Sequence, residues 1–194
     1  MAEIVLLRHG DTEWSISGQH TGRTDLPLVE SGRQRAKSLA PVLAKRDFGL
    51  VLCSPMKRAR QTAELAGLVP DDLDDNMLEW DYGAYEGMTT PQIREELGSP
   101  NWLIWDNVIR PGDTPGETTD DVARRAQKVL DRCLPVLAED RDCVLVAHGH
   151  YLRILTATWL GLESTDGKLF VLEAGALSSL GFEREQHVVT SWNQ

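Results

Sequence analysis

Short apolar runs alternate with amphipathic stretches along most of the chain. Each apolar run carries no charged residue, as is typical of strands that are buried on both faces of a sheet. These predicted strands cover residues 4–7, 48–53 and 144–147. The predicted helices cover residues 31–44, 57–66, 90–97, 118–138 and 150–160.

Two of the predicted helices indicate a cap and a buried face. Ser31 is expected to cap the first helix, which carries Leu39, Val42 and Leu43 at helical spacing. The helix over residues 118–138 carries one continuous apolar stripe, which we expect to face the core. The stripe consists of Val122, Ala126, Val129, Leu130, Leu134 and Leu137.

The alternation of strand and helix patterns predicts an α/β fold, a three-layer α/β/α sandwich with a largely parallel sheet. Residues 175–183 and 187–192 alternate between apolar and polar positions, as in a terminal hairpin. The three apolar runs end next to Arg8, Ser54 and His148. Because ligands of such folds bind beyond the carboxyl ends of the strands, we expect these ends to face one crevice.

The composition limits the class of protein. With 194 residues, 41% of them apolar, the chain suits a single domain with at most a small lid. Its three cysteines show no CxxC spacing, so we predict a reducing compartment rather than a disulfide framework or a zinc site. No early apolar run is long enough for a signal peptide or a membrane span, and we expect a cytoplasmic protein.

The formal net charge of −10 disfavours nucleic acid and anionic membranes as partners. A site for an anionic substrate therefore needs cations that are concentrated in one pocket. Three stretches of the chain supply them.

Arg8, His9 and Gly10 directly follow the first predicted strand. Phosphoryl transfer needs a nucleophile and several donors for the oxygens on which charge spreads in the transition state. A neutral histidine supplies the nucleophile, an adjacent arginine clamps oxygens, and a glycine lets the backbone approach closely. Because a histidine at a strand end is also a common structural residue, this tripeptide alone favours catalysis only weakly.

The helix that follows Ser54 and Pro55 opens with three basic residues, Lys57, Arg58 and Arg60. Cations near a helix N-terminus are unfavourable unless an anion faces them. We therefore predict that Arg58 contributes to an anion site. Lys57 and Arg60 are equally compatible with a solvated surface.

His148 and His150 flank Gly149 at the end of the third predicted strand. We predict that His148 is a charged phosphate ligand and that His150 either caps the next helix or lines the pocket. A His-x-His pair also occurs in metal sites, but no carboxylate or cysteine pair stands near it in the sequence to complete one. We therefore predict no metal.

Glu79 is the candidate general acid. A leaving alkoxide needs a proton, and a carboxyl group whose pKa is raised by apolar surroundings supplies one. Trp80 and Tyr82 offer such surroundings. Asp81 and Glu86 are alternative carboxyl groups in the same stretch, and the residues alone leave the choice open.

A series of short motifs follows one another from residue 4 to residue 160. They are Arg8-His9-Gly10-Asp11-Thr12-Glu13-Trp14, Thr21-Gly22-Arg23-Thr24-Asp25-Leu26-Pro27-Leu28, Ser54-Pro55, Arg58-Ala59, Thr62-Ala63, Glu79, Tyr82-Gly83, Glu86-Gly87, Gly116-Glu117-Thr118 and Ala147-His148-Gly149. In these motifs and in their order the chain resembles the histidine phosphatase (phosphoglycerate mutase-like) superfamily, and agreement of all of them by chance is improbable.

The resemblance implies His9 as the phosphorylated nucleophile and Glu79 as the proton donor. It also implies that Arg8, Arg58 and His148 form the rest of the phosphate pocket. The family needs no metal or organic cofactor, and a small-molecule phosphomonoester is the expected substrate. The residues expected on the substrate side are Ser15, Thr21, Gly22, Tyr82, Gly149 and His150.

The chain departs from the family pattern in two places. Ser15 stands where the family usually has an asparagine that helps to hold the phosphate, and the shorter hydroxyl reaches it only through a water or a local shift. Residues 88–115 form a short lid-like insertion where cofactor-dependent mutases carry a much longer one. A mutase must keep water from its phosphoenzyme, which a short lid does poorly, so we favour a hydrolase. The insertion offers Arg94, Trp102, Trp105 and Arg110.

Trp102 and Trp105 either pack against a substrate or, more simply, anchor the lid. Residues 148–153 look like a branch that includes broad-specificity acid phosphatases and sugar bisphosphatases, so we predict an acid phosphatase or a sugar-phosphate phosphatase. The alternatives are a cofactor-dependent phosphoglycerate mutase and a non-catalytic member of the fold. The latter is disfavoured because all five predicted catalytic residues are present. The C-terminal hairpin also allows a homodimer.

Overall fold

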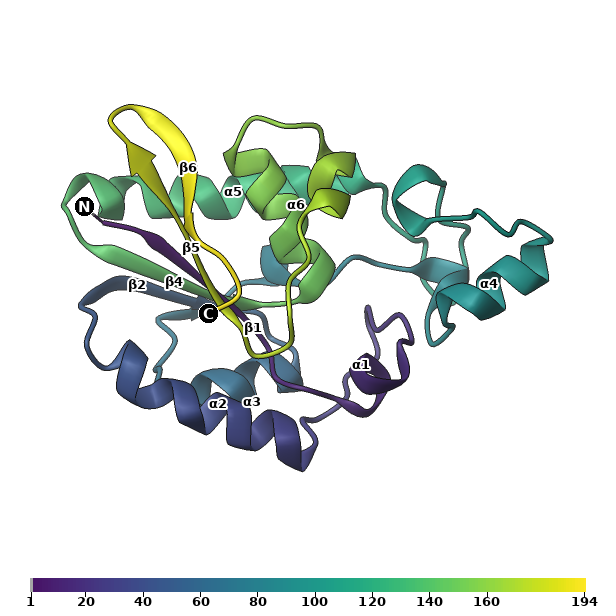
Figure 1. Cartoon of the computed structure of the whole chain (residues 1–194), viewed down its shortest axis with the longest axis horizontal. Coiled ribbons are helices and arrows are strands. Elements are labelled where there is room, and N and C mark those ends of the chain that lie inside the picture. The colour runs from purple at the N-terminus through teal and green to yellow at the C-terminus, as the bar shows by residue number, and fades with distance from the viewer. Residues whose placement is uncertain (1) are drawn as a thin grey trace.

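A mixed sheet of six strands runs through the molecule (Figure 1). The computed structural model describes residues 2–194, and its strands are β1 (Ile4–Arg8), β2 (Phe48–Cys53), β3 (Asp72–Leu73), β4 (Asp142–Ala147), β5 (Leu177–Glu183) and β6 (Gln186–Ser191). Their spatial order is β3-β2-β4-β1-β5-β6. The first four strands of this order pair in parallel, β5 runs antiparallel to β1, and β5 and β6 form a hairpin. The predicted largely parallel sheet and terminal hairpin are confirmed.

Helices cover both faces of this sheet. They are α1 (Glu13–Ser17), α2 (Glu30–Leu43), α3 (Lys57–Leu65), α4 (Thr90–Leu97), α5 (Thr119–Ala138) and α6 (Gly149–Trp159), with 3₁₀ turns at Asp75–Met77, Gly83–Tyr85, Ile104–Asp106 and Ser164–Leu169. Figure 1 shows α2 and α3 on one face and α5 and α6 on the other. The three-layer α/β/α arrangement is therefore confirmed.

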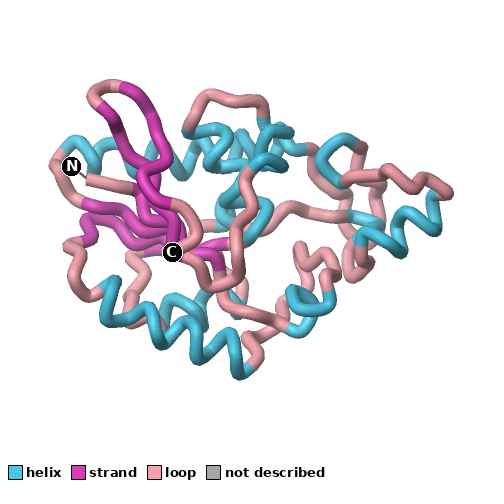
Figure 2. The backbone as a smooth tube through the Cα atoms, viewed as in Figure 1, coloured by secondary structure: helices cyan, strands magenta, loops and turns pink. Residues whose placement is uncertain are grey.

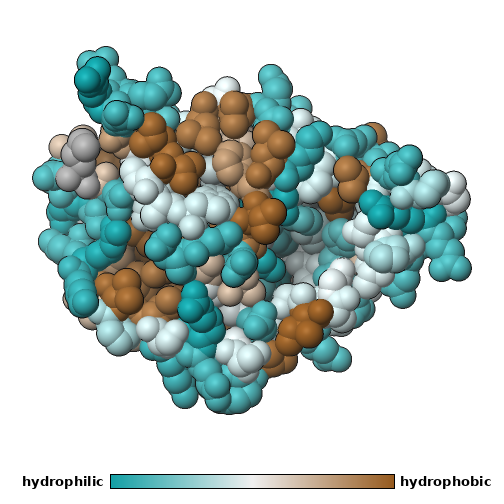
Figure 3. Space-filling view, viewed as in Figure 1, coloured by the Kyte–Doolittle hydropathy of each residue, from teal (hydrophilic) through white to brown (hydrophobic). Residues whose placement is uncertain are grey.

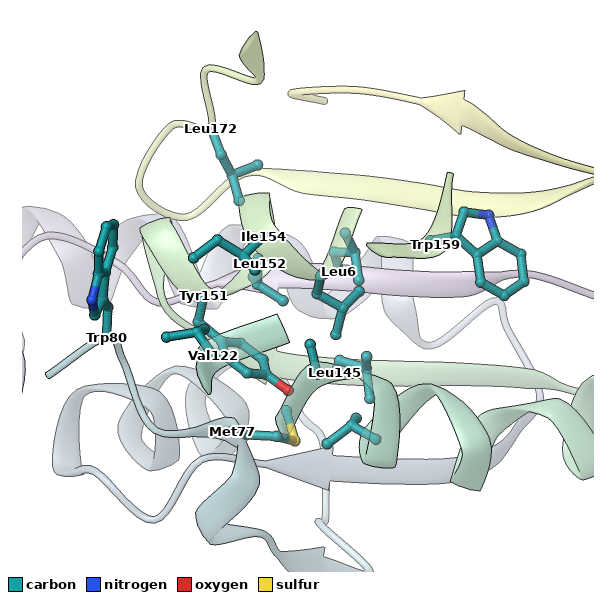
Figure 4. Close-up of a cluster of buried hydrophobic side chains, with 14 of the residues drawn as sticks. Leu6, Met77, Trp80, Val122, Leu145, Tyr151, Leu152, Ile154, Trp159 and Leu172 are labelled. Atoms are coloured by element: carbon teal, nitrogen blue, oxygen red, sulfur yellow. The ribbon is translucent and has the colours of Figure 1, made fainter. Parts of the chain in front are cut away.

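The apolar runs of the central strands β1, β2 and β4 are buried on both sides because each side meets a helix layer. Val5 of β1 belongs to the core that contains Leu39 of α2. Its neighbour Leu6 belongs to the opposite core, which contains Val122 of α5 and Leu152 of α6. Figure 4 shows these last three side chains gathered over the sheet. Burial on both faces explains why the strands are uninterrupted apolar runs.

The predicted cap of α2 is wrong by two residues. The N-cap is Val29, which makes no capping bond through its side chain, and Ser31 lies inside the helix. The Ser31 hydroxyl instead donates to Asp11 Oδ2 at 3.4 Å, while the Val29 amide donates to the Asp11 carbonyl. Val42 was also expected on the apolar side and is 50% exposed. Contacts with the loop after β1, rather than a local cap, determine where α2 begins.

The predicted stripe of α5 is correct except at one position. Its N-cap is Thr118, whose hydroxyl accepts from the Asp121 amide. Leu134 is 38% exposed, whereas the neighbouring Cys133 is buried. All three cysteines are buried free thiols and serve as small apolar core residues.

Residues 88–115 form a lobe of loops and short helices around α4, beyond the strands (Figure 2). Trp102 packs edge-on against Tyr85 at 5.1 Å between ring centroids, and the Trp102 carbonyl accepts from Arg94 Nε. Trp105 packs against Trp80 at 5.4 Å. Both tryptophans are buried and tie the lobe to the rest of the chain. Over residues 2–194, no helix combines the length and apolar character that crossing a membrane requires.

Candidate active site

A pocket of about 310 Å³ opens between α1, the first turns of α6 and the lobe formed by residues 88–115. This volume suits a small molecule. The surface in Figure 3 is hollowed between the body that holds the sheet and the lobe around α4. Predicted site residues in the lining are Arg8, His9, Ser15, Thr21, Glu79, Tyr82, Gly149 and His150. The other three, Gly22, Arg58 and His148, are not part of the lining.

His9 follows β1, and its imidazole is held as one tautomer. Nδ1 lies 2.8 Å from the Gly10 carbonyl oxygen. Because a carbonyl only accepts, Nδ1 carries the proton and Nε2 keeps its lone pair. Burial, and then the charges of Arg58 and Arg8, lower the pKa of His9 well below its ordinary value. The ring is therefore neutral near pH 7, and its free Nε2 can act as a nucleophile.

Gly10 brings the loop after β1 against the start of α2. A Cβ atom at Gly10 would lie 2.5 Å from the Gly32 carbonyl oxygen, which no side chain allows. The Gly10 amide donates to Thr62 Oγ1 at 3.1 Å. The close backbone approach predicted for this glycine is confirmed, and it helps to fix the position of His9.

His148 lies beside His9, with 5.1 Å between the ring centroids. Its Nδ1 accepts from Arg58 Nε at 3.1 Å, so its Nε2 carries the proton and donates to Ser54 Oγ at 2.7 Å. Burial, followed by the charge of Arg58, lowers the pKa of His148 well below its ordinary value. The predicted charged ligand is therefore corrected, because the structure holds a neutral imidazole. The ends of the three apolar strands meet here, as expected.

Arg58 is fully buried in the first turn of α3 and fixes the loop that carries Thr21 and Gly22. Besides its bond to His148, Nη2 donates to the Thr21 and Gly22 carbonyls and Nη1 to the Thr24 carbonyl. Arg58 does not line the pocket itself, but its positive charge acts on His9, which does. Lys57 and Arg60 are exposed, in keeping with a solvated surface.

Gly22 and Glu86 have structural contacts. The Gly22 and Thr24 amides both donate to the Glu86 carboxylate, and a Cβ atom at Gly22 would lie 2.7 Å from it. The expectation that Gly22 lines the substrate side is therefore corrected. The Glu86 carboxylate is bonded to these amides and lies outside the pocket lining, so it is not positioned to act as the general acid.

Arg8 places a partly unpaired guanidinium beside His9. Its Nη1 donates to the Leu172 carbonyl, whereas its Nε is buried and has no partner among residues 2–194. A Cβ atom at Gly149 would lie 3.1 Å from that Nε, so the glycine gives the guanidinium its space. A buried N–H without an acceptor is costly, and a bound anion would satisfy it.

Glu79 is buried opposite this cation cluster and caps the N-terminus of α6. Its Oε1 accepts from the Trp80 and Tyr151 amides at 2.9 and 2.8 Å, and its Oε2 accepts from the His150 amide at 3.1 Å. Burial is the largest influence on the pKa of Glu79 and raises it, although the three amides and Arg58 oppose the shift. Oε2, with a single partner, is the oxygen that is free to carry a proton.

Asp81, the other alternative acid, is held away from the pocket. Its Oδ1 accepts from the Gly83 amide at 2.9 Å and from the Thr114 hydroxyl, and it does not line the pocket. Of the three carboxyl groups considered, only Glu79 therefore faces the site.

An ion pair behind Glu79 positions the stretch that carries it. Arg125 Nε and Nη2 donate to the two oxygens of Glu117 at 2.8 and 2.9 Å. Arg125 Nη1 also donates to the Asn76 and Leu78 carbonyls. In turn, the Glu117 carbonyl accepts from Trp80 Nε1 at 2.7 Å. The Asp81 amide also donates to Glu117 Oε2 at 3.0 Å, so Arg125 and Glu117 together fix the chain on both sides of Glu79.

The outer part of the pocket is aromatic and its histidines are neutral. The Tyr82 hydroxyl and His150 Nδ1 share a hydrogen bond of 2.7 Å, and the two rings meet edge to face. Burial lowers the pKa of His150 well below its ordinary value, and it lowers that of His20. Trp105 completes this wall, with its ring 4.8 Å from that of His150. His150 lines the pocket, which was one of its two predicted roles.

Ser15 has a local role that explains its presence in place of asparagine. Its hydroxyl accepts from the Thr12 amide at 2.8 Å and donates to the Thr12 carbonyl, and its own amide donates to Thr12 Oγ1. This is a capping box at the start of α1. Thr21 also lines the pocket, with its hydroxyl bonded to the Gln19 carbonyl.

The sequence did not single out several residues of the lining, among them His20, Arg153 and Leu172. His20 precedes Thr21, a residue of the family motif, and Arg153 lies three residues after His150 on the same face of a helix. Their positions in the sequence could therefore have indicated that both line the pocket. Leu172 is in a loop without a motif. In the part of the chain that the structure describes, no three His, Cys, Asp or Glu side chains cluster as metal ligands.

Comparison with known proteins agrees with this geometry. Residues 4–194 match the model of the histidine phosphatase superfamily (branch 1). An acid phosphatase from Mycobacterium tuberculosis is 38% identical over 182 residues, which cover 93% of this chain and 86% of the relative. Sedoheptulose 1,7-bisphosphatase from Saccharomyces cerevisiae is 37% identical over 183 residues, which cover 81% of this chain and 67% of the relative.

The solved structures agree as well. One from Mycobacterium tuberculosis, described as the product of an open reading frame, superposes with a TM-score of 0.90 at 36% identity and covers 99% of this chain and 97% of its own. Since the family model spans nearly the whole chain and the named relatives are phosphatases, a phosphatase is supported over a mutase. The chain is a phosphatase that belongs to the histidine phosphatase superfamily.

Proposed function

We propose that the chain hydrolyses small organic phosphomonoesters through a phosphohistidine on His9, with Glu79 as the proton donor. The observation that carries this proposal is the tautomer of His9. Nδ1 donates to the Gly10 carbonyl, so Nε2 is unprotonated in a pocket that Arg8, with its unpaired Nε, also lines. A nucleophile and an oxygen-binding donor therefore occupy the same wall of one pocket.

In the first step, His9 Nε2 attacks phosphorus and the ester P–O bond breaks. The leaving oxygen takes the proton from Glu79 Oε2, which leaves a carboxylate. In the second step, a water attacks the phosphoryl group, Glu79 takes up a proton from that water, and the N–P bond breaks. Phosphate leaves, and the neutral imidazole and the carboxyl group return to their starting states.

The positive charges stabilise the phosphoryl group in both steps. Arg8 binds oxygens directly, while Arg58 contributes its charge through His148. His148 donates a proton from Nε2, which a small movement of Ser54 would redirect from its hydroxyl to a phosphate oxygen. On the substrate side, Ser15, Thr21, Tyr82, Gly149 and His150 surround the organic group of the ester.

The proposed organisation is a single domain in which residues 88–115 act as a short lid over the pocket. The lid contributes Thr90, Leu103, Ile104 and Trp105 to the lining. Its short length supports hydrolysis, because water must reach the phosphohistidine.

The direct test is trapping of the intermediate. Rapid quenching of the enzyme with a ³²P-labelled substrate is expected to give an acid-labile, base-stable label on His9. The His9→Ala variant is expected to lose the label and at least 10³-fold in kcat. Undiminished turnover by His9→Ala would overturn the proposal, and efficient transfer between the 2- and 3-positions of phosphoglycerate would favour the mutase.

The setting of this activity is also a proposal. We place the enzyme in the cytoplasm and expect no nucleic-acid partner, since its net charge is −10 and its cysteines are free. A homodimer would form through β6, which is an edge strand of the sheet. Sedimentation at several concentrations tests the dimer.

A further inference from the structure

Arg153 is a cation of the pocket that the proposed reaction does not use. It lies on α6 and lines the pocket together with Arg8. Its Nε donates to the Gly167 carbonyl at 3.0 Å and its Nη2 to the Lys168 carbonyl at 3.1 Å. Its Cζ lies 4.6 Å from the centre of the Trp105 ring. These contacts fix the guanidinium plane and leave Nη1 without a hydrogen bond to residues 2–194.

Arg153 also lacks a counter-ion within residues 2–194. Other arginines of this range pair with a carboxylate, as Arg23 does with Glu117 and Arg132 with Asp74. No carboxylate of these residues lies within ion-pair distance of Arg153. Its positive charge is therefore available to an anion that enters the pocket.

The charges of the lining do not balance with a single phosphate. Arg8 and Arg153 are the cations of the lining, and Glu79 is its only carboxyl group. Glu79 must be protonated to act as the acid, so it offers no charge to Arg153 when a substrate binds. A phosphoryl group on His9 is matched by Arg8 and, from behind, by Arg58. The positive charge of Arg153 then remains uncompensated.

The two cations are held by different partners. The Arg8 guanidinium lies against Gly149 and donates to the Leu172 carbonyl. The Arg153 guanidinium lies over the Trp105 ring and donates to the Gly167 and Lys168 carbonyls. Because the two groups share no partner, we assign an anion on Arg153 to a second group of the substrate rather than to the reacting phosphate.

We propose that Arg153 binds a second anionic group of the substrate, a phosphate or a carboxylate, so that the preferred substrates are phosphomonoesters with two anionic ends. This proposal rests on the proposed function, because it takes the reacting phosphate to be the one at His9. The guanidinium is held in place by Gly167, Lys168 and Trp105, so its Nη1 offers fixed N–H donors to the oxygens of such a group.

The test compares matched substrate pairs by the ratio of their kcat/KM values. Fructose 1,6-bisphosphate against fructose 1-phosphate probes a second phosphate, and 3-phosphoglycerate against glycerol 3-phosphate probes a carboxylate. The native enzyme is expected to prefer the doubly anionic member of at least one pair by about 10- to 100-fold, the range of a charged hydrogen bond. The pair that shows the preference identifies the anion.

Arg153→Met keeps a stem that packs on Trp105 and removes the charge, and it is expected to bring that ratio close to one. Arg153→Lys is expected to retain part of the preference. The matched control is Arg60→Met, which removes an exposed charge outside the pocket and is expected to keep the native ratio. Melting temperatures of all variants monitor folding.

Two results would overturn the assignment: a native enzyme without preference in either pair, or an Arg153→Met variant that loses activity equally on both members of each pair. The second result would mean that Arg153 only supports the fold. Both are distinguishable from failure of the proposed function, which would appear as undiminished turnover in His9→Ala.

Discussion

The inner and the outer parts of the pocket are built by different means. In the inner part, hydrogen bonds with backbone groups fix the side chains of His9 and Glu79. A hydrogen bond between Arg58 and His148 joins α3 to the end of β4. The outer wall, around His150 and Trp105, is held mainly by packed aromatic rings and one stacked arginine. Hydrogen-bonding groups in fixed positions suit the phosphoryl transfer, which is the same for every substrate. A wall of packed aromatic rings tolerates different organic groups of the ester.

The difference predicts that changes in the inner part lower activity on every substrate, while changes in the outer part alter the preference among substrates. The largest effect is expected for Glu79→Gln, which keeps the shape but removes the acidic proton. For alkyl phosphates kcat should fall about 10²- to 10⁴-fold. For p-nitrophenyl phosphate, whose leaving group needs little protonation, the loss should be much smaller. Steady-state kinetics on both esters check this, and equal losses would remove Glu79 as the acid.

The pH profile is expected to show the next largest effect. The pKa of Glu79 is raised above its ordinary value of 4.5, and its carboxyl group must be protonated to act as the acid. Activity should therefore fall as the pH rises through that pKa, by up to about tenfold per pH unit. The pKa of His9 lies well below 6.5 and its neutral form is needed, so activity should persist into acid. An acidic optimum follows. The basic limb should flatten in Glu79→Gln, and an optimum above pH 8 would contradict the assignment.

Arg125→Met tests whether the ion pair behind Glu79 supports the chemistry. Arg125 does not line the pocket, but it donates to the carbonyls of Asn76, Leu78 and Glu79, so its loss should misplace Glu79. We expect about a tenfold lower kcat for alkyl phosphates and a smaller change for p-nitrophenyl phosphate. The matched control is Arg124→Met, an exposed neighbour on α5. If Arg125 has only a structural role, its loss should lower kcat equally for both esters.

Trp105→Leu should have the smallest effect on rate. The wall would lose ring contacts with His150 and Trp80 and the stacking partner of Arg153. Stability should fall by about 2 kcal/mol, somewhat less than for truncation to alanine. The kcat/KM ratios among substrates should shift about threefold, with p-nitrophenyl phosphate changing least. A uniform loss on all substrates would show that the two parts of the pocket are not separable.

The inner part was largely predictable from the sequence, because several of its residues stand at or directly after the end of an apolar strand. Arg8 and His148 are examples, and the parallel arrangement of β1 and β4 brings their ends together. The neutral state of His148 was not predictable. It depends on a bond to Arg58 from a helix 90 residues away in the chain. Of the outer wall, His150 and Tyr82 were predicted, whereas Leu172 lies in a loop of the pocket lining where the sequence carries no periodic pattern or motif that indicates its neighbours.

The position of Glu79 at the N-terminus of α6 links proton transfer to the mobility of a helix. An ionised carboxylate accepts the amides of His150 and Tyr151 more strongly than a neutral carboxyl group does. In the proposed cycle the carboxylate exists while the phosphoryl group is on His9. Amide hydrogen exchange at these two positions should therefore slow in the phosphorylated enzyme.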